Sequence, residues 1–265
     1  MSEPLSGTLD QIIEAVARRL GAALTPEGRP APVPRKVEVL TAPLVDPPTT
    51  NRDLARFIDH TLLRPEAGAT AIEQLCHDAL RFGFAAVCVN PLWVEYCARL
   101  LAGSGVHVAT VAGFPLGATT ARLKAIEAAE VVRLGAGEVD MVVNLGKLKE
   151  GDWAAVRADM EGVVEAAAGA TVKAIIETGL LDEEEKIAAC LLARAAGVDF
   201  VKTSTGINSS GATIEDVRLM RRVVGHGLGV KAAGGIRDAA SACALLAAGA
   251  TRLGTSASVA IVLGS

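Results

Sequence analysis

The stretch DEEEKIAACLLARAAGVDFVKTSTG, residues 182–206, holds one complete helix-to-strand unit. Asp182 and Glu185 form a capping-box pattern where a helix would start, and Gly197 fits the end of that helix. The residues after this glycine predict a short buried strand, Phe200–Lys202, which ends on a lysine before a polar, glycine-ended turn. A helix and a strand joined in this way predict an alternating β/α fold with parallel strands.

The same unit recurs from residue 53 onward. Two further predicted helices have recognisable ends: one begins at Thr213 with Asp216 and ends at Gly225, and the other begins at Asp238 and ends at Gly249. The predicted strands are Phe57–Thr61, Ala85–Val89, His107–Ala112, Val139–Val143, Val172–Glu177, Phe200–Lys202, Gly229–Ala232 and Arg252–Thr255. Eight strands in about 210 residues predict a (β/α)8 TIM barrel. An open doubly wound sheet is the alternative, and it is weaker because no GxGxxG turn follows the first strand.

The N-terminal part of the chain has a different composition. We predict an extension over residues 1–52 and the barrel over residues 53–265. Seven of the eleven prolines lie between Pro26 and Pro48, which predicts an extended linker in this region.

An amphipathic helix is predicted before this linker, over residues 8–20. Its apolar side chains recur at helical spacing, Thr8 and Gln11 fit a capping box, and Gly21 fits the end. The extension is then either a loosely packed or disordered tail, or a segment that docks on the barrel or on a second subunit.

Composition narrows the class of protein. The chain has 265 residues, of which 51% are hydrophobic and 3% aromatic, so one large domain with a core of small aliphatic residues is expected. Its net charge of -4 predicts neither a nucleic-acid partner nor an anionic membrane partner. Five dispersed cysteines and the lack of a secretory-signal pattern predict reduced thiols in a cytoplasmic protein. The four histidines lack metal-ligand spacing, which predicts no metal.

Polar side chains gather near the C-terminal ends of the predicted strands, where a TIM barrel carries its active site. Asp59 and Thr61 end the first strand, Asp140 lies on the fourth, and Lys202 and Lys231 lie on the sixth and seventh. Two ammonium groups held close together, and burial, both favour the neutral amine of one lysine. A neutral amine forms a Schiff base with a carbonyl compound, and a nearby carboxylate can move protons. The pattern predicts a metal-free aldolase; the alternative is a set of structural ion pairs.

Two loops predict a phosphate site. AGGIRD, residues 233–238, follows the seventh strand, and GTSAS, residues 254–258, follows the eighth. Glycine lets the backbone approach a ligand, and barrels often bind phosphate at these two loops. Two other residues stay undecided, because the register that would place the side chains of Lys173 and Cys88 inside or outside the cavity is not fixed.

The chain resembles the deoxyribose-phosphate aldolases, a family of class I aldolases, over about Leu54 to Leu263. The motifs that carry the resemblance are IDHTLLRPEAGAT, VCVNPLWV, TVAGFPLG, GAGEVDMVVNLGKLKEGD, VKAIIETGLL, DFVKTSTG, GATIEDVRLM, VKAAGGIR and LGTSASV. This family cleaves 2-deoxy-D-ribose 5-phosphate reversibly to acetaldehyde and D-glyceraldehyde 3-phosphate. The resemblance implies the same small-molecule chemistry here, without metal or cofactor, in a homo-oligomer that we expect to be a dimer.

The resemblance also implies roles for single residues. Lys202 becomes the Schiff-base lysine, Lys231 lowers its pKa and assists proton transfer, and Asp140 is the general acid/base, which acts through a water molecule. Asp59 and Thr61 help to orient the substrate and the second lysine. The other substrate- and phosphate-binding positions are Thr205, Gly234, Gly235 and Ser256.

Three positions depart from the pattern of many relatives. Ala233 and Ala257 stand where serine is found, and Ile207 stands where some members carry lysine. Fewer side-chain donors near the phosphate lead to the hypothesis that unphosphorylated aldehydes are tolerated. Two other functions stay open: another Schiff-base sugar-phosphate aldolase or transaldolase, and a barrel that binds a sugar phosphate or a partner protein without catalysis.

Overall fold

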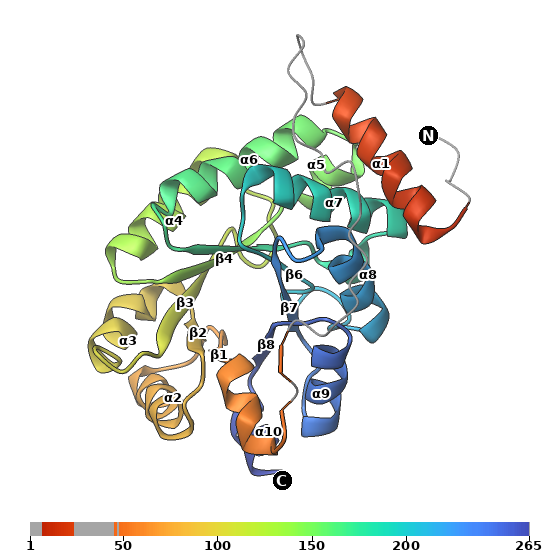
Figure 1. The fold of residues 1–265 in the computed structure, drawn as a ribbon. Helices are drawn as coiled ribbons and strands as arrows, with labels where there is room; N and C mark the ends of the chain where they lie inside the picture. The colour runs from red at the N-terminus through yellow and green to blue at the C-terminus, as the bar shows by residue number, and fades with distance from the viewer. Residues whose placement is uncertain (1–6, 24–44, 47, 265) are drawn as a thin grey trace.

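The computed structural model describes residues 7–23, 45–46 and 48–264, in which eight parallel strands close into a barrel (Figure 1). Each strand pairs with the next along the chain, and β8 pairs with β1. The strands are β1 (Ile58–Leu62), β2 (Ala86–Val89), β3 (His107–Ala112), β4 (Glu138–Val142), β5 (Thr171–Ile175), β6 (Phe200–Lys202), β7 (Gly229–Ala233) and β8 (Arg252–Thr255). The ends of the strands differ from the predicted bounds by at most two residues. The TIM-barrel prediction is confirmed, and the doubly wound alternative is wrong.

Helices surround the strands. They are α2 (Ala69–Phe82), α3 (Val94–Leu100), α4 (Ala121–Arg133), α5 (Leu145–Lys149), α6 (Trp153–Ala166), α7 (Glu183–Ala196), α8 (Ile214–Val224), α9 (Ala239–Ala247) and α10 (Ser258–Leu263), with short 3-10 helices η1 (Asn51–Phe57), η2 (Pro91–Trp93) and η3 (Thr178–Leu180). None of the helices within the described ranges is long and apolar enough to cross a membrane.

The predicted helix ends are present. Asp182 and Glu185 form the capping box of α7, and Gly197 ends this helix with a left-handed φ of 80°. After α9, Gly249 donates its amide to Leu246 and the next amide bonds to Leu245, which is the hydrogen-bond pattern of a Schellman motif. These caps provide hydrogen-bond partners for backbone groups that the helix ends leave unpaired. The capping residues therefore determine where α7 begins and where α7 and α9 end.

The N-terminal helix, α1 (Leu9–Ala23), docks on the barrel and is not a loose tail. Arg19 contacts Glu184 on α7 at 2.8 Å, and Arg222 on α8 donates to Asp10 at 2.8–3.0 Å. Its core-facing side chains are at most 2% exposed: Ile13, Val16 and Leu20. The helix ends two residues beyond the predicted stop, and most of the predicted proline-rich linker lies outside the described residues.

Side chains alternate between the inside and the outside of the barrel. On β5, Val172 and Ala174 belong to the main apolar core, while Lys173 between them points inward. A small apolar cluster lines β2 and β3 inside the barrel: Ala86, Cys88, Ala109 and Val111. The opposite side of the interior carries charged residues, and this asymmetry positions the candidate site.

Candidate active site

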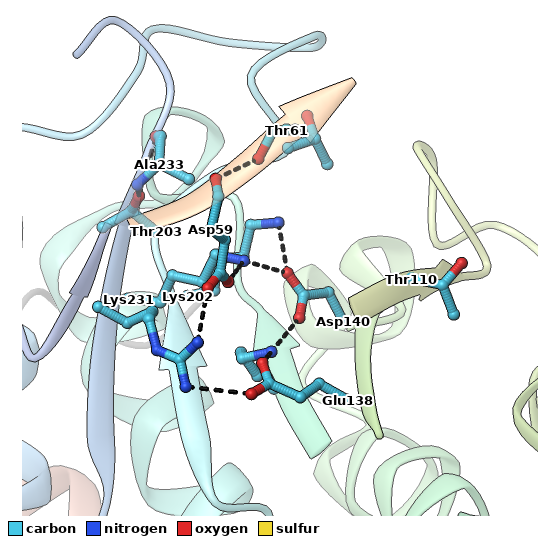
Figure 2. A network of polar contacts seen from close by, with 12 residues as sticks. Asp59, Thr61, Thr110, Glu138, Asp140, Lys202, Thr203, Lys231 and Ala233 are labelled. Atoms are coloured by element: carbon cyan, nitrogen blue, oxygen red, sulfur yellow. Dashed lines mark hydrogen bonds and ion pairs between the residues drawn. The ribbon is translucent and has the colours of Figure 1, made fainter. Parts of the chain in front are cut away.

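Asp140 on β4 is the centre of a charge cluster inside the barrel (Figure 2). Its Oδ2 accepts hydrogen bonds from the Nζ atoms of Lys202 and Lys231, at 2.8 and 2.7 Å, and its Oδ1 accepts one from Lys173 at 2.8 Å. The three lysines lie on the consecutive strands β5, β6 and β7, and Lys202 and Lys231 are register partners. The barrel thus directs three ammonium groups toward one buried carboxylate.

Three further charged residues complete a closed ring of ion pairs. Asp59 on β1 binds Lys231 and also accepts from Arg252 on β8 at 2.6 Å. Arg252 contacts Glu138 at 3.1 Å, and Glu138 contacts Lys173 at 2.5 Å. We call this the ion-pair ring, in which cations and anions alternate: Asp59, Lys231, Asp140, Lys173, Glu138 and Arg252.

Lys202 stands outside the ion-pair ring. The ring holds three cations and three carboxylates, so its formal charges cancel. The side chain of Lys202 is only 4% exposed, and its one ion pair within the described chain is with Asp140, which already has two ring partners. Lys202, if protonated, would be a fourth buried cation that shares its only carboxylate with two ring lysines. Burying a charge that is not fully paired costs free energy.

The pKa directions follow this arrangement. Burial lowers the pKa of Lys202, and the charge of Lys231 lowers it further, against the opposing effect of Asp140. Burial also disfavours the charged form of Lys231, but Asp140 and Asp59 outweigh burial and raise the pKa of Lys231. Lys202 is therefore the lysine of the pair that more readily becomes a neutral nucleophile.

Two carboxylates of the ring, Asp140 and Asp59, stay ionised. Burial would raise the pKa of Asp140, but the three lysines outweigh burial and hold this pKa well below its ordinary value. The same balance, with Lys231 and Arg252 as the leading cations, lowers the pKa of Asp59 to about 2. At neutral pH Asp140 is thus a base that has already lost its proton.

The structure settles where the two undecided side chains lie. Lys173 faces the interior as a member of the ion-pair ring. Cys88 also faces the interior, in the small apolar cluster. Burial raises the pKa of the Cys88 thiol, so it stays neutral and does not disturb the charge balance of the ring.

A cavity of about 710 Å³ opens above Lys202 at the C-terminal ends of the strands. Asp140, Lys231 and Asp59 lie beneath it, where they are almost completely buried. The hydroxyl of Thr61 donates to the backbone carbonyl of Asp59 at 2.8 Å, so Thr61 holds the strand that carries this carboxylate. The predicted residues that line the cavity are Thr61, Lys202, Thr205, Gly234, Gly235 and Ser256.

The loops after β6 and β7 press together to form one wall of the cavity. Gly234 and Gly235 both have left-handed φ angles, 86° and 78°. A Cβ atom on Gly211 would lie 2.0 Å from the carbonyl oxygen of Gly234, so this close approach requires glycine. Because the loop after β7 lacks side chains at two successive positions, its backbone is open to a ligand in the cavity.

Sequence reasoning missed several residues of the site. Glu138 and Arg252 are the first residues of their strands. Each lies two positions before an inward-facing residue, Asp140 or Gly254, so strand alternation could have predicted that Glu138 and Arg252 also face inward. Arg237 lies in the quoted AGGIRD loop and lines the cavity, although no role was assigned to it. No group of three or more histidines, cysteines or acidic residues in the described chain is arranged to hold a metal ion.

Comparison with known proteins places this geometry in a family. The model of the DeoC/LacD family of aldolases matches residues 53–260. A deoxyribose-phosphate aldolase from Streptococcus pneumoniae (serotype 19F, strain G54) is 56% identical over 211 residues, which cover 80% of this chain and 96% of the relative.

Two solved structures extend the comparison. A protein from Coccidioides immitis with a provisional assignment as a deoxyribose-phosphate aldolase aligns with a TM-score of 0.82 and 37% identity, over 97% of this chain and 98% of its own. The tetrameric deoxyribose phosphate aldolase from Aeropyrum pernix gives a TM-score of 0.76 and 35% identity, over 81% of this chain and 91% of its own. The chain therefore belongs to the DeoC/LacD family of aldolases.

Proposed function

We propose that the protein reversibly cleaves 2-deoxy-D-ribose 5-phosphate to acetaldehyde and D-glyceraldehyde 3-phosphate through a Schiff base on Lys202. The observation that carries this proposal is the position of Lys202, whose amine lies outside the ion-pair ring and on the wall of the cavity. An amine that is buried, incompletely paired and reachable by substrate has the properties of a carbonyl nucleophile.

The first half of the reaction forms an iminium ion. The neutral amine of Lys202 attacks C1 of the open-chain aldehyde, and the carbinolamine takes up a proton and loses water. Lys231 keeps its proton because its pKa is raised, so it serves as a fixed positive charge and a hydrogen-bond donor beside the reacting nitrogen. Asp140 carries negative charge next to the developing iminium and stabilises it.

The second half breaks the C2–C3 bond, because acetaldehyde keeps two carbons of the sugar. Asp140, acting through a water molecule, accepts the proton of the C3 hydroxyl while the bonding electrons move to the iminium nitrogen. D-Glyceraldehyde 3-phosphate leaves, and a neutral enamine remains on Lys202. Protonation of the enamine at C2 and addition of water then release acetaldehyde and the free amine.

The phosphate end of the substrate lies in the wall formed by the loops after β6, β7 and β8. Backbone amides at Gly234 and Gly235 and the hydroxyl of Ser256 are the proposed ligands, and the exposed guanidinium of Arg237 adds positive charge. Ile207 also lines the cavity and offers no donor, which supports the hypothesis of tolerance for unphosphorylated substrates. A strong kinetic preference for the phosphorylated sugar over free deoxyribose would contradict that hypothesis.

The test is borohydride trapping. The protein is incubated with deoxyribose 5-phosphate, reduced with sodium borohydride, digested and mapped by mass spectrometry. We expect one reduced adduct on Lys202, its loss in Lys202→Met, and its retention in the control Lys149→Met, whose lysine is exposed on α5. An adduct on Lys231 or Lys173 would reassign the nucleophile, and no adduct under turnover conditions would support a non-catalytic barrel.

We further propose that the protein assembles as a homodimer, with residues 53–265 as the catalytic unit. The A. pernix relative is tetrameric, which supports self-association in this family. Sedimentation velocity at micromolar concentration distinguishes the dimer from a monomer or a tetramer.

A further inference from the structure

Glu177 is a buried carboxylate just beyond the end of β5. Its exposed fraction is 0%, and its backbone has φ 54° and ψ 61°, in the left-handed region. Among the described residues, only Glu177 and Ala168 take a positive φ without being glycine. A non-glycine residue held in this region costs free energy and persists only where the surrounding structure requires it.

Among the described residues, the hydrogen-bond partners of the Glu177 carboxylate all belong to the loop between β6 and α8, which directly follows Lys202. Its two carboxylate oxygens accept the backbone N–H of Thr205 at 3.2 and 3.4 Å, and Oε1 accepts the hydroxyl of Ser209 at 2.6 Å. The ion pairs of the described chain include none to Glu177. A buried carboxyl group without a cation depends on its hydrogen-bond partners, so Glu177 and this loop conformation stabilise each other.

Hydrogen bonds to the Thr205 side chain also fix the next residues of the loop. Its hydroxyl oxygen accepts the backbone amides of Ile207 and Asn208, at 3.1 and 3.3 Å, and the Asn208 side chain donates to the carbonyl of Pro115 at 2.6 Å. Thr205, Gly206 and Ile207 line the cavity. The backbone N–H of Thr205 is already bonded to Glu177, so the hydroxyl proton is the donor that Thr205 has left for a ligand.

We infer that Glu177 is a positioning residue that holds the β6–α8 loop against the phosphate end of the substrate and thereby strengthens the binding of phosphorylated sugars. This inference rests on the proposed function. No hydrogen bond or ion pair among the described residues joins Lys202 or the ion-pair ring to Thr205 or Ser209, so loosening the loop affects substrate binding more than the covalent step. The expected effect of loosening the loop is a higher KM for the phosphorylated sugar and little change for the unphosphorylated one.

The experiment compares wild type and Glu177→Gln with two substrates, deoxyribose 5-phosphate and free deoxyribose. An amide has one acceptor oxygen where the carboxylate has two, so one of the loop contacts is lost. We expect KM for the phosphorylated sugar to rise roughly 10-fold or more, since a buried N–H group that loses its acceptor is costly and the loop would shift to avoid it. The values of kcat, and of kcat/KM for free deoxyribose, should change by less than about 3-fold.

A second variant, Ser209→Ala, removes one donor to Glu177 from a half-buried side chain and leaves the carboxylate in place. We expect a smaller change in the same direction, and this variant decides the question if Glu177→Gln does not fold. Equal losses on both substrates, or an unchanged ratio between them in both variants, would overturn the inference. Failure of the wild-type protein to cleave deoxyribose 5-phosphate would instead overturn the proposed function, which borohydride trapping tests separately.

Discussion

Lys202 and Lys231 donate to the same atom, Oδ2 of Asp140, from 2.8 and 2.7 Å. The two lysines differ in what else they contact, because Lys231 also binds Asp59 whereas Lys202 has no second carboxylate among the described residues. The two lysines therefore differ in how easily they lose a proton, although both bind the same oxygen. The lysine with two anions keeps its proton, and the lysine with one gives up its proton more easily.

Replacing Lys231 with methionine tests this asymmetry. The variant removes the like charge that lowers the pKa of Lys202 and leaves Asp140 free to pair with Lys202, so the pKa of Lys202 rises. We expect kcat at pH 7 to fall by about 100-fold, within the range seen when one hydrogen-bond donor at a reacting centre is lost. The acid limb of the pH–kcat profile should move to higher pH. A reduced rate with an unmoved limb would show that Lys231 acts only by contacting the substrate.

Stability at acid pH depends on His60, on the outer face of β1. Its Nδ1 lies 2.9 Å from the hydroxyl of Ser258, and its ring packs 5.1 Å from that of Phe84. Burial lowers the pKa of His60 from 6.5 to about 4, against a small opposing effect of Asp78. Because the folded-state pKa lies below the unfolded one, folding favours the neutral ring. The stabilisation is complete above pH 6.5 and decreases as the pH falls toward 4.

Urea unfolding at pH 7 and pH 4.5 measures this contribution. The wild-type free energy of unfolding should fall by about 2–3 kcal/mol more than that of His60→Gln over this interval. The comparison with His60→Gln subtracts the carboxylates common to both proteins, including Asp59. Equal pH dependence of the two proteins would mean that His60 is not held neutral in the fold.

Gly254 leaves space beside the catalytic cluster. A Cβ atom at this position would lie 3.0 Å from Cε of Lys231 and 3.1 Å from Cβ of Ala233, closer than ordinary contact. In Gly254→Ala we expect Lys231 to shift and kcat to fall roughly 10-fold, since small misplacements at a reacting centre are costly. The control Gly21→Ala lies in α1 with no atom within 4 Å of the added carbon, and it should leave kcat unchanged. Wild-type kcat in Gly254→Ala would show that Lys231 has room to move.

Lys124 and Asp159 form a buried ion pair between α4 and α6. Lys124 is fully buried and donates to Asp159 at 2.5 Å and to the carbonyl of Val142, at the end of β4, at 2.8 Å. Lys124→Met would leave the Asp159 carboxylate buried without its cation, and we expect a loss of about 3–5 kcal/mol in the free energy of unfolding. Lys149→Met, which breaks a more exposed pair with Glu185, should cost less than about 1 kcal/mol.

The double variant Lys124→Met with Asp159→Leu separates two explanations. If the cost arises from an unpaired charge, removing Asp159 as well should restore most of the stability measured by urea unfolding. A double variant as unstable as Lys124→Met would assign the cost to the lost bond with the carbonyl of Val142.

The fold was predictable because each strand and helix carries its own signals. Capping residues such as Asp182 and Thr213 and the short apolar strands are local features, and parallel β/α units have few ways to assemble. The convergence of Lys202, Lys231 and Asp140 follows from the same logic, since strand ends meet at one rim of a barrel. These inferences needed only the order of the strands.

The ion-pair ring was not predictable in the same way. Alternation gives the parity of Lys173 relative to its neighbours, but which parity faces inward depends on the stagger between strands. Glu138 and Arg252 meet across the barrel from β4 and β8, a contact that no local pattern encodes. Glu177 was predicted to end the fifth strand, but it lies past β5 in a left-handed conformation that apolar periodicity does not reveal.

The docking of α1 has a consequence for the order of folding. Arg19 and Asp10 are paired with Glu184 and Arg222, which follow them by 165 and 212 residues in the chain. During synthesis α1 emerges before the strands and helices of the barrel, but its binding surface is complete only after α8 has emerged. A helix that is made before the barrel is therefore among the last to reach its final contacts, and the barrel must assemble without its help.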